Sequence, residues 1–262
     1  MAGPKVLIGI PSLMVKVGFT PFDICVDRLT EGLDPTFAQV FRPMGGVVVR
    51  GRNEIVREAI RREAEYIWFL DDDQPFHPGG SGHPSDLEAL LARGCEAVIP
   101  LSCRRGAPFL PLLYDHVHEQ GWIASQRYLL DHEHGLIKVA GAGMAGLLIK
   151  TAIFQEMGTD GWFEFVHPPD NFDDYAEDFP FYRKLADLGV QLYCDLEVRF
   201  GHEFTGVAYI VKQQGKWVTV LADSAPFVAF PQPAPPHDKL VAPSPAEMHL
   251  IGQRNARRAK AG

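Results

Sequence analysis

Short apolar segments alternate with amphipathic segments between Lys5 and Thr205. Runs of apolar side chains without helical spacing predict buried strands over residues 6–10, 66–70 and 97–100. Amphipathic or capped segments between these runs predict helices. Strand, helix and strand in this order indicate parallel strands joined by right-handed crossovers. The pattern therefore predicts an α/β fold whose mixed, mostly parallel sheet is flanked by helices.

Local end signals delimit the helices. Thr20 and Pro21 predict a helix that runs to about Glu31, and Asn53 is expected to cap a helix over residues 54–65. A shorter helix is predicted over residues 85–92, and Thr151 is expected to cap a further helical turn. A helix from Glu177 has Pro180 in its first turn and ends before Gly189.

The remaining segments complete the predicted domain. Strand-like residues occur over 37–49, 147–150 and 191–198, and residues 209–212 and 217–221 flank a hairpin turn. Residues 101–138 predict a small hairpin layer, with 136–140 as its return strand. Seven prolines between Pro226 and Pro245 precede a basic C-terminal segment. We therefore predict one domain over residues 1–222 and an extended, Pro-rich tail over residues 223–262.

Composition narrows the function classes. The net charge of −8 and pI near 5.7 argue against general nucleic-acid or membrane-surface binding. Four cysteines without a C-x-x-C pair indicate neither a zinc knuckle nor a disulfide framework, which suits a reducing cytoplasm. No apolar stretch approaches the roughly 18 residues that a membrane span needs.

Three adjacent carboxylates follow the predicted strand over residues 66–70. Open α/β sheets bind ligands at the carboxyl ends of their strands, so Asp71, Asp72 and Asp73 are expected at the ligand edge. Neighbouring carboxylates repel one another unless water or a cation separates them. Asp71 and Asp73, at alternate positions, suit Mg²⁺ or Mn²⁺ carried by a phosphate-bearing substrate. A solvated acidic turn is the alternative.

Later segments add further candidates. Glu177 and Asp178 begin a helix, where they are either catalytic or simply stabilised by the helix dipole. His202 follows a strand and either completes a metal site or makes an ordinary hydrogen bond. The glycine-dense stretch from Gly141 to Gly146 permits close approach to a ligand or serves as a tight bend.

In order and spacing, these motifs resemble the GT-A-type, family 2-like glycosyltransferases of the kind often encoded by bacteria and their phages. The resemblance covers roughly Lys5 to Thr205 and includes Phe69–Asp73 as a "DxD" element and Glu177–Phe179 as an "ED" element. It implies a GT-A-like fold and the following candidates: Pro11, Arg52, Asp71, Asp72, Gly143, Met144, Ala145 and Gly146 for donor binding, Asp73, Asp71 and His202 as metal ligands, and Asp178 or Glu177 as catalytic base. The third aspartate leaves the ligand choice open between Asp71 with Asp73 and Asp72.

The resemblance also implies a reaction. A UDP- or GDP-type sugar donor and Mn²⁺ or Mg²⁺ are expected, with inversion at the anomeric carbon. The acceptor stays open among modified DNA, a glycan or a small metabolite, and Arg104 with Arg105 could guide a polyanion. The expected location is the cytoplasm, which is that of the host if a phage encodes the chain.

Two other classes of function compete with this one. A metal-dependent nucleotidyltransferase or nucleotide-sugar pyrophosphohydrolase also needs acids at a strand end, although no glycine-rich phosphate loop follows the first strand. A non-catalytic binding module is the third possibility.

Overall fold

The structure is a computed structural model that describes part of the chain. The described residues are 5–11, 20–31, 33–43, 46–80, 83–106, 108–118, 124–166, 177–203, 207–222 and 228–231. All of them belong to the compact unit Met1–Gln232. The predicted extended tail lies mostly beyond this unit and outside the described residues.

A seven-stranded sheet forms the centre of this unit, in the order β2-β1-β3-β9-β4-β10-β7. Its strands are β1 (Val6–Gly9), β2 (Ala38–Phe41), β3 (Tyr66–Phe69), β4 (Ala97–Leu101), β7 (Leu136–Val139), β9 (Leu148–Lys150) and β10 (Leu192–Arg199). β1, β2, β3, β4 and β10 run in one direction, whereas β7 and β9 run against their neighbours. The predicted α/β class with a mostly parallel sheet is confirmed.

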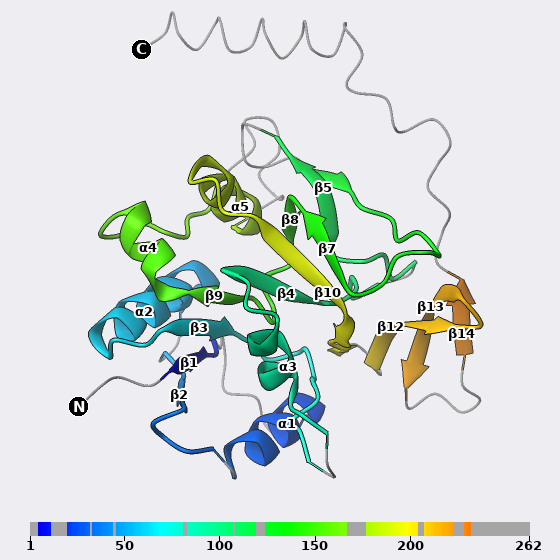
Figure 1. Ribbon diagram of the computed structural model, residues 1–262, viewed down its shortest axis with the longest axis horizontal. Helices are drawn as coiled ribbons and strands as arrows, with labels where there is room; N and C mark the ends of the chain where they lie inside the picture. Colours follow the sequence, from blue (N-terminus) through cyan, green and yellow to red (C-terminus); the bar gives the residue numbers. More distant parts are fainter. Residues whose placement is uncertain are drawn as a thin grey trace, which may run out of the picture. The chain divides into compact units, whose positions relative to one another are not determined.

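Helices cover both faces of this sheet (Figure 1). One face carries α2 (Val48–Arg61), α4 (Thr151–Met157) and α5 (Asp178–Asp187), and the other carries α1 (Pro21–Thr30) and α3 (Asp86–Ala92). A hydrophobic core lies on each face of the sheet, and alternate residues of β3 pack into one core or the other. Ile67 and Phe69 pack toward α2, and Tyr66 and Trp68 pack toward α1. Strands buried on both faces explain the continuous apolar runs in the sequence.

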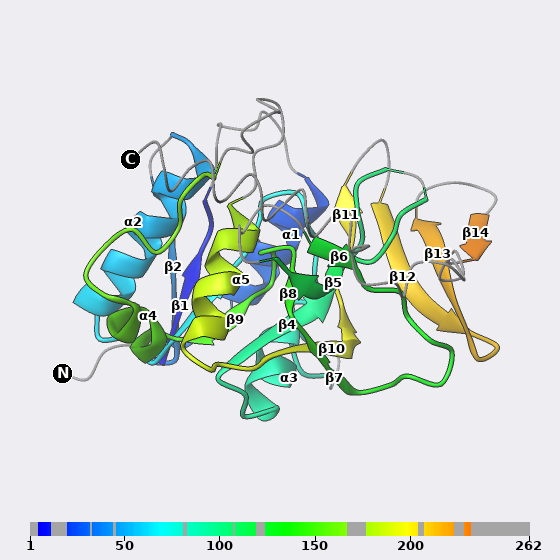
Figure 2. The ribbon, with the colours of Figure 1, turned by 90° about the horizontal axis from the view of Figure 1, so that it is seen from above.

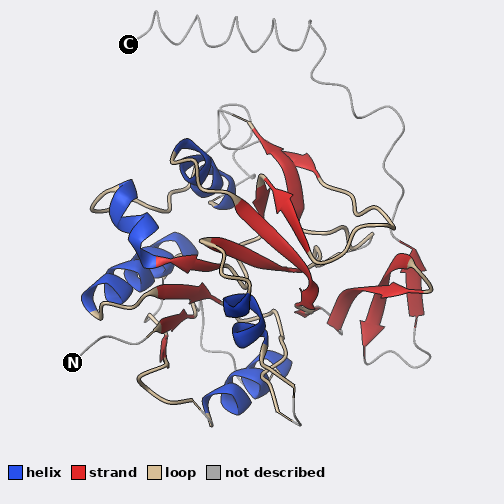
Figure 3. Cartoon of the chain, in the orientation of Figure 1, coloured by secondary structure: helices blue, strands red, loops and turns tan. Residues whose placement is uncertain are grey.

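Two smaller sheets accompany the central one (Figures 2 and 3). β5 (Leu113–Val117), β6 (Ala124–Gln126) and β8 (Gly141–Ala142) form the predicted small layer. The predicted return strand of that layer, β7, instead pairs with β10 in the central sheet. β11 (His202–Glu203), β12 (Val207–Gln213), β13 (Lys216–Ala222) and β14 (Val228–Pro231) form the other sheet, which continues past the boundary predicted at residue 222.

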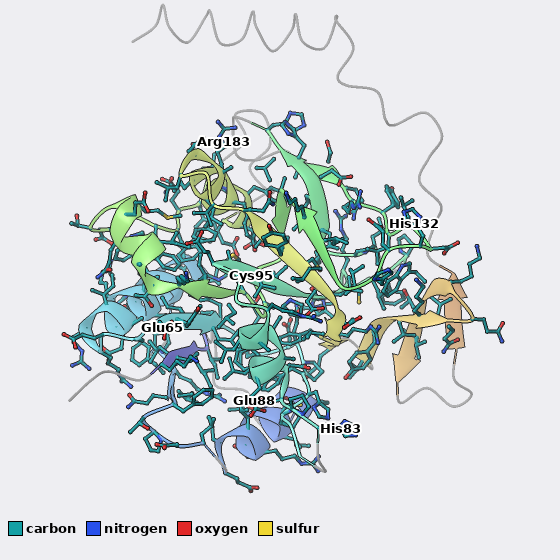
Figure 4. The ribbon with its side chains drawn as sticks, viewed as in Figure 1. Glu65, His83, Glu88, Cys95, His132 and Arg183 are labelled. Carbon is teal, nitrogen blue, oxygen red and sulfur yellow. The ribbon has the colours of Figure 1, made fainter. Side chains whose placement is uncertain are left out.

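Capping signals succeeded in part. The predicted cap of α1 at Thr20 is confirmed, and Thr20 forms a capping box with Asp23. A second capping box, of Ser85 with Glu88, begins α3 and was not among the predicted caps; Glu88 is labelled in Figure 4. The prediction that Thr151 caps a helix is wrong, because Lys150 occupies the N-cap and Thr151 is the first residue of α4. Along the described ranges, none of the helices is long and apolar enough to cross a membrane.

The predicted start of α2 is also wrong. The helix begins at Val48, so Asn53 lies inside it rather than at its cap. The Asn53 side chain instead makes two hydrogen bonds with the backbone of Phe163, at 2.9 and 3.1 Å. Val48 and Val49 favour strands intrinsically, but tertiary packing overrides that weak preference here.

The burial of the Asp86 carboxyl group predicts that the free energy of unfolding depends on pH. Its carboxylate accepts a hydrogen bond from the His77 backbone N–H at 2.7 Å, and burial raises its pKa from 3.8 to about 6. A raised pKa in the folded state stabilises the fold below pH 4, and this contribution disappears as the pH rises through about 6. Asp86→Asn keeps an acceptor but cannot ionise. Relative to wild type, we expect the variant to gain up to about 3 kcal/mol of unfolding free energy between pH 4 and pH 7. Urea titrations at several pH values test this, and two parallel stability curves would contradict it.

Candidate functional site

Topology brings the candidate residues to one edge of the central sheet. The carboxyl ends of β1, β3, β4 and β10 meet at this edge because these strands run the same way. Crossover helices run back against the strands, so α2 and α5 begin there. β9 runs in the opposite direction, and the turn that precedes it therefore also lies at this edge.

The Arg52 guanidinium is the most connected group at this edge. Nη1 donates to Glu177 Oε1 at 2.8 Å and to Asp178 Oδ1 at 3.0 Å, while Nη2 donates to the two Asp71 oxygens at 3.2 and 3.3 Å. Its side chain is 2% exposed, and its Nε has no partner among the described residues. Arg52 thus connects α2, the turn after β3 and the start of α5. We call these four residues the Arg52 cluster.

One guanidinium does not balance three carboxylates. Burial raises the pKa of Asp178 well above its ordinary value; Arg52 opposes this shift, and the charges of Glu177 and Asp71 add to it. Burial would lower the pKa of Arg52, but the surrounding carboxylates raise it above its usual range. The cluster therefore holds a fixed cation next to a carboxyl group with unusually high proton affinity. Asp178 and Glu177 keep 28% and 17% exposure, so an approaching substrate can reach them.

Asp73 and His202 form a second centre. His202 Nδ1–H donates to the Cys103 carbonyl oxygen at 2.6 Å, since a carbonyl can only accept. Burial lowers the pKa of His202, so the ring is neutral at neutral pH and Nε2 carries a lone pair. That nitrogen lies 3.5 Å from Asp73 Oδ2, which is also an acceptor. Two acceptors that face each other are complementary to a cation.

Backbone hydrogen bonds hold this second centre in place. Glu203 N–H donates to the Asp73 carbonyl, and Gly201 N–H donates to the Pro75 carbonyl, both at 2.8 Å. The Glu203 side chain in turn accepts from Phe22 N–H at 3.0 Å. The segment that follows β10, including β11, is therefore hydrogen-bonded to the acidic turn and to the start of α1.

The donor set fits a divalent metal that brings other ligands with it. Among the residues that the structure describes, no three His, Cys, Asp or Glu side chains form a group that could hold a metal ion. Asp73 and His202 supply one oxygen and one nitrogen, and the Cys103 carbonyl orients the imidazole in the way typical of metal-bound histidines. Mg²⁺ and Mn²⁺ commonly take their remaining ligands from phosphate and water. Asp71 is held by Arg52, and its predicted role as a metal ligand stays a prediction.

The glycine-dense turn packs tightly against the end of β3. Gly146 N–H donates to the Phe69 carbonyl at 2.7 Å, and Gly146 adopts φ +83°. A Cβ at Gly146 would lie 2.3 Å from the Pro100 ring, so close approach requires glycine. Met144 and Ala145 are both 1% exposed. The predicted lining of a donor sugar by Gly143–Gly146 is not tested by these contacts.

Two predicted donor contacts lie beside these centres. Pro11, at the end of β1, packs next to Gly51, where a Cβ would lie 3.1 Å from the proline ring. Asp72 lies in the turn between Asp71 and Asp73. The structure thus places both at the predicted edge, and their roles stay predictions.

Several contacts at the candidate site were not predicted from the sequence. The Tyr182 hydroxyl donates to the Gly143 carbonyl at 3.2 Å, and the Arg105 guanidinium contacts Asp73 Oδ2. From the sequence, Arg105 is expected only as a guide for a polyanion. The ion network of Arg52 had a detectable signal: Arg52 shares one helical face with Ile55, Val56 and Ala59, and all four are buried.

Comparisons with known proteins give little guidance. No family model and no curated protein matches the chain. Among solved structures, the A197 protein of STIV is 14% identical over 88% of this chain and 97% of its own, with a TM-score of 0.47. A nucleoside-diphosphate-sugar pyrophosphorylase from Vibrio cholerae RC9 is 9% identical over 73% and 91%, with a TM-score of 0.38. Both TM-scores lie below 0.5, so neither similarity establishes a function.

The Arg52 cluster predicts that replacing Arg52 lowers the free energy of unfolding substantially. Arg52→Gln leaves three carboxylates without their cation, and breaking a buried ion pair costs about 3–5 kcal/mol. We expect a loss of this size in urea unfolding at pH 8 and a smaller loss at pH 5, where protonation relieves the repulsion. Arg57→Gln is the control, because Arg57 lies on the same helix in an exposed pair with Asp160. Equal losses for the two variants would contradict the prediction.

Proposed function

We propose that this chain is a metal-dependent glycosyltransferase that moves a sugar from a nucleoside-diphosphate sugar to an acceptor hydroxyl with inversion. One observation carries the proposal. Asp73 and His202 present two acceptors to a cation, and the carboxyl groups of Glu177 and Asp178, of which burial raises the pKa of Asp178, lie at the same edge of the sheet. The reaction needs both kinds of centre: one to bind the leaving diphosphate and one to accept a proton.

The diphosphate of the donor would bind at Asp73 and His202. When bound there, Mn²⁺ or Mg²⁺ would neutralise charge on the departing diphosphate as a Lewis acid. Arg52 donates hydrogen bonds to both oxygens of Asp71, which would contact the nucleotide. The other donor contacts proposed from the sequence are Pro11, Asp72, Gly143, Met144, Ala145 and Gly146.

The acceptor end would rest on Asp178 or Glu177. The acceptor oxygen forms a bond to the anomeric carbon while the bond from that carbon to the phosphate oxygen breaks. The electron pair of the broken bond leaves with the nucleoside diphosphate, and the hydroxyl proton passes to the carboxylate. A carboxylate with a raised pKa is a stronger base than an ordinary one, which suits a weakly acidic hydroxyl.

The carboxylate excess favours this reaction over nucleotidyl transfer. A sugar phosphate that attacks a nucleotide is already ionised and needs no base. Its negative charge would also be repelled by the Arg52 cluster, in which three carboxylates surround one guanidinium. A neutral hydroxyl acceptor meets neither objection.

Calorimetric titration with UDP and GDP, each with and without Mn²⁺, tests the donor site. We expect metal-dependent binding of one nucleotide and its loss in Asp73→Ala, which removes a metal ligand. Asp160→Asn, an exposed aspartate that pairs with Arg57, should bind like wild type. Metal-independent binding, or binding that survives Asp73→Ala, would reject the proposed metal site.

The base is tested by separating binding from transfer. Asp178→Asn keeps the size of the side chain and a hydrogen-bond acceptor but cannot take a proton. We expect nucleotide affinity within about threefold of wild type and a fall in kcat of roughly 10²–10⁴, the usual contribution of a general base. Glu177→Gln should then change kcat far less. The reverse pattern would assign the base to Glu177, and unaffected turnover in both variants would refute a carboxylate base here.

A further inference from the structure

Arg105 lies in the short loop after β4 and contacts the second centre from outside. Its guanidinium contacts Asp73 Oδ2, the same oxygen that faces His202 Nε2. The Arg105 side chain is 62% exposed, whereas the Asp73 side chain is 19% exposed. A solvent-exposed cation thus occupies the carboxylate oxygen that a metal ion would need.

The contact is not required to hold the loop. Arg104 N–H donates to the Leu110 carbonyl at 2.8 Å, and Phe109 N–H donates to the Gly106 carbonyl at 2.7 Å. Cys103 and Pro111 form a β-bridge at its base. Exposed ion pairs contribute little to stability, so a purely structural role for Arg105 gains little support.

We propose that Arg105 is an exchangeable counter-ion that leaves Asp73 when a metal–nucleotide complex binds and then contacts the diphosphate. This inference rests on the proposed function and adds a phosphate-binding residue to it. Arg105 and a divalent cation would compete for one carboxylate oxygen, because two cations on it would repel each other. The displaced guanidinium has a long, exposed side chain, and arginine binds phosphate oxygens through paired N–H donors.

The exchange predicts that loss of Arg105 changes the affinity for the metal alone and the affinity for the metal–nucleotide complex in opposite directions. Without Arg105, Asp73 has no internal competitor, so metal alone should bind more tightly. The diphosphate loses a charged donor, so the metal–nucleotide complex should bind more weakly. A residue that only maintains the shape of the site would weaken both.

The test compares Arg105→Gln with wild type in two titrations. Mn²⁺ alone is followed by the electron paramagnetic resonance signal of the free ion, and UDP or GDP with saturating Mn²⁺ is followed by calorimetry. We expect Mn²⁺ to bind roughly two- to fivefold more tightly to the variant, as for loss of an exposed ion pair. Nucleotide binding should weaken roughly tenfold, as for loss of a charge-assisted hydrogen bond.

Controls separate the exchange from other effects. Arg105→Lys keeps the charge and should recover part of the nucleotide affinity. Arg183→Gln removes an arginine that pairs with Asp187 on α5 and is labelled in Figure 4, and it should change neither titration. Unchanged nucleotide affinity in Arg105→Gln, or weakening of both titrations, would overturn the proposal. Wild type that binds Mn²⁺ but no nucleotide would instead reject the proposed function, and the Mn²⁺ titration would still decide whether Arg105 competes for Asp73.

Discussion

The burial of one guanidinium among three carboxylates is the constraint on which this edge of the molecule depends. Arg52 is 2% exposed, and a charge removed from water to this extent must be compensated nearby. The compensation comes from Asp71 after β3 and from Glu177 and Asp178 at the start of α5. The start of α5 therefore has to meet α2 and the turn after β3, more than a hundred residues earlier in the chain, so the same interaction that holds the edge together also positions its acids.

Local signals in the sequence predicted much of the fold. The apolar runs of β1, β3 and β4 and the cap of α1 at Thr20 depend on nearby residues, and the structure has all of them. The start of α2 depended instead on long-range contacts. Asn53 has the chemistry of a cap, but its hydrogen bonds go to Phe163, more than a hundred residues away.

Strand direction was beyond local analysis for the same reason. The apolar run of β9 resembles that of a parallel strand, yet β9 runs against β3 and β4. Nothing within three residues encodes direction, because it follows from where the chain arrives after the small sheet. That reversal places the turn of Gly146 at the carboxyl ends of the parallel strands, where its N–H donates to the Phe69 carbonyl. The glycines can be identified in the sequence, but the residues that pack against them in the fold cannot.

The charges of the two centres bear on how a donor could bind. The Arg52 cluster has more carboxylates than cations, and Asp73 faces the lone pair of a neutral His202. A free nucleoside diphosphate would bring further negative charge to an edge that already has an excess of it, at a cost that grows as water is displaced. Under the proposed function, the metal and the diphosphate therefore have to arrive together or metal first. Arg105, already in contact with Asp73, is the one cation at this pair that the described chain itself provides. Its release would leave the metal–diphosphate complex, rather than the protein, as the partner of Asp73.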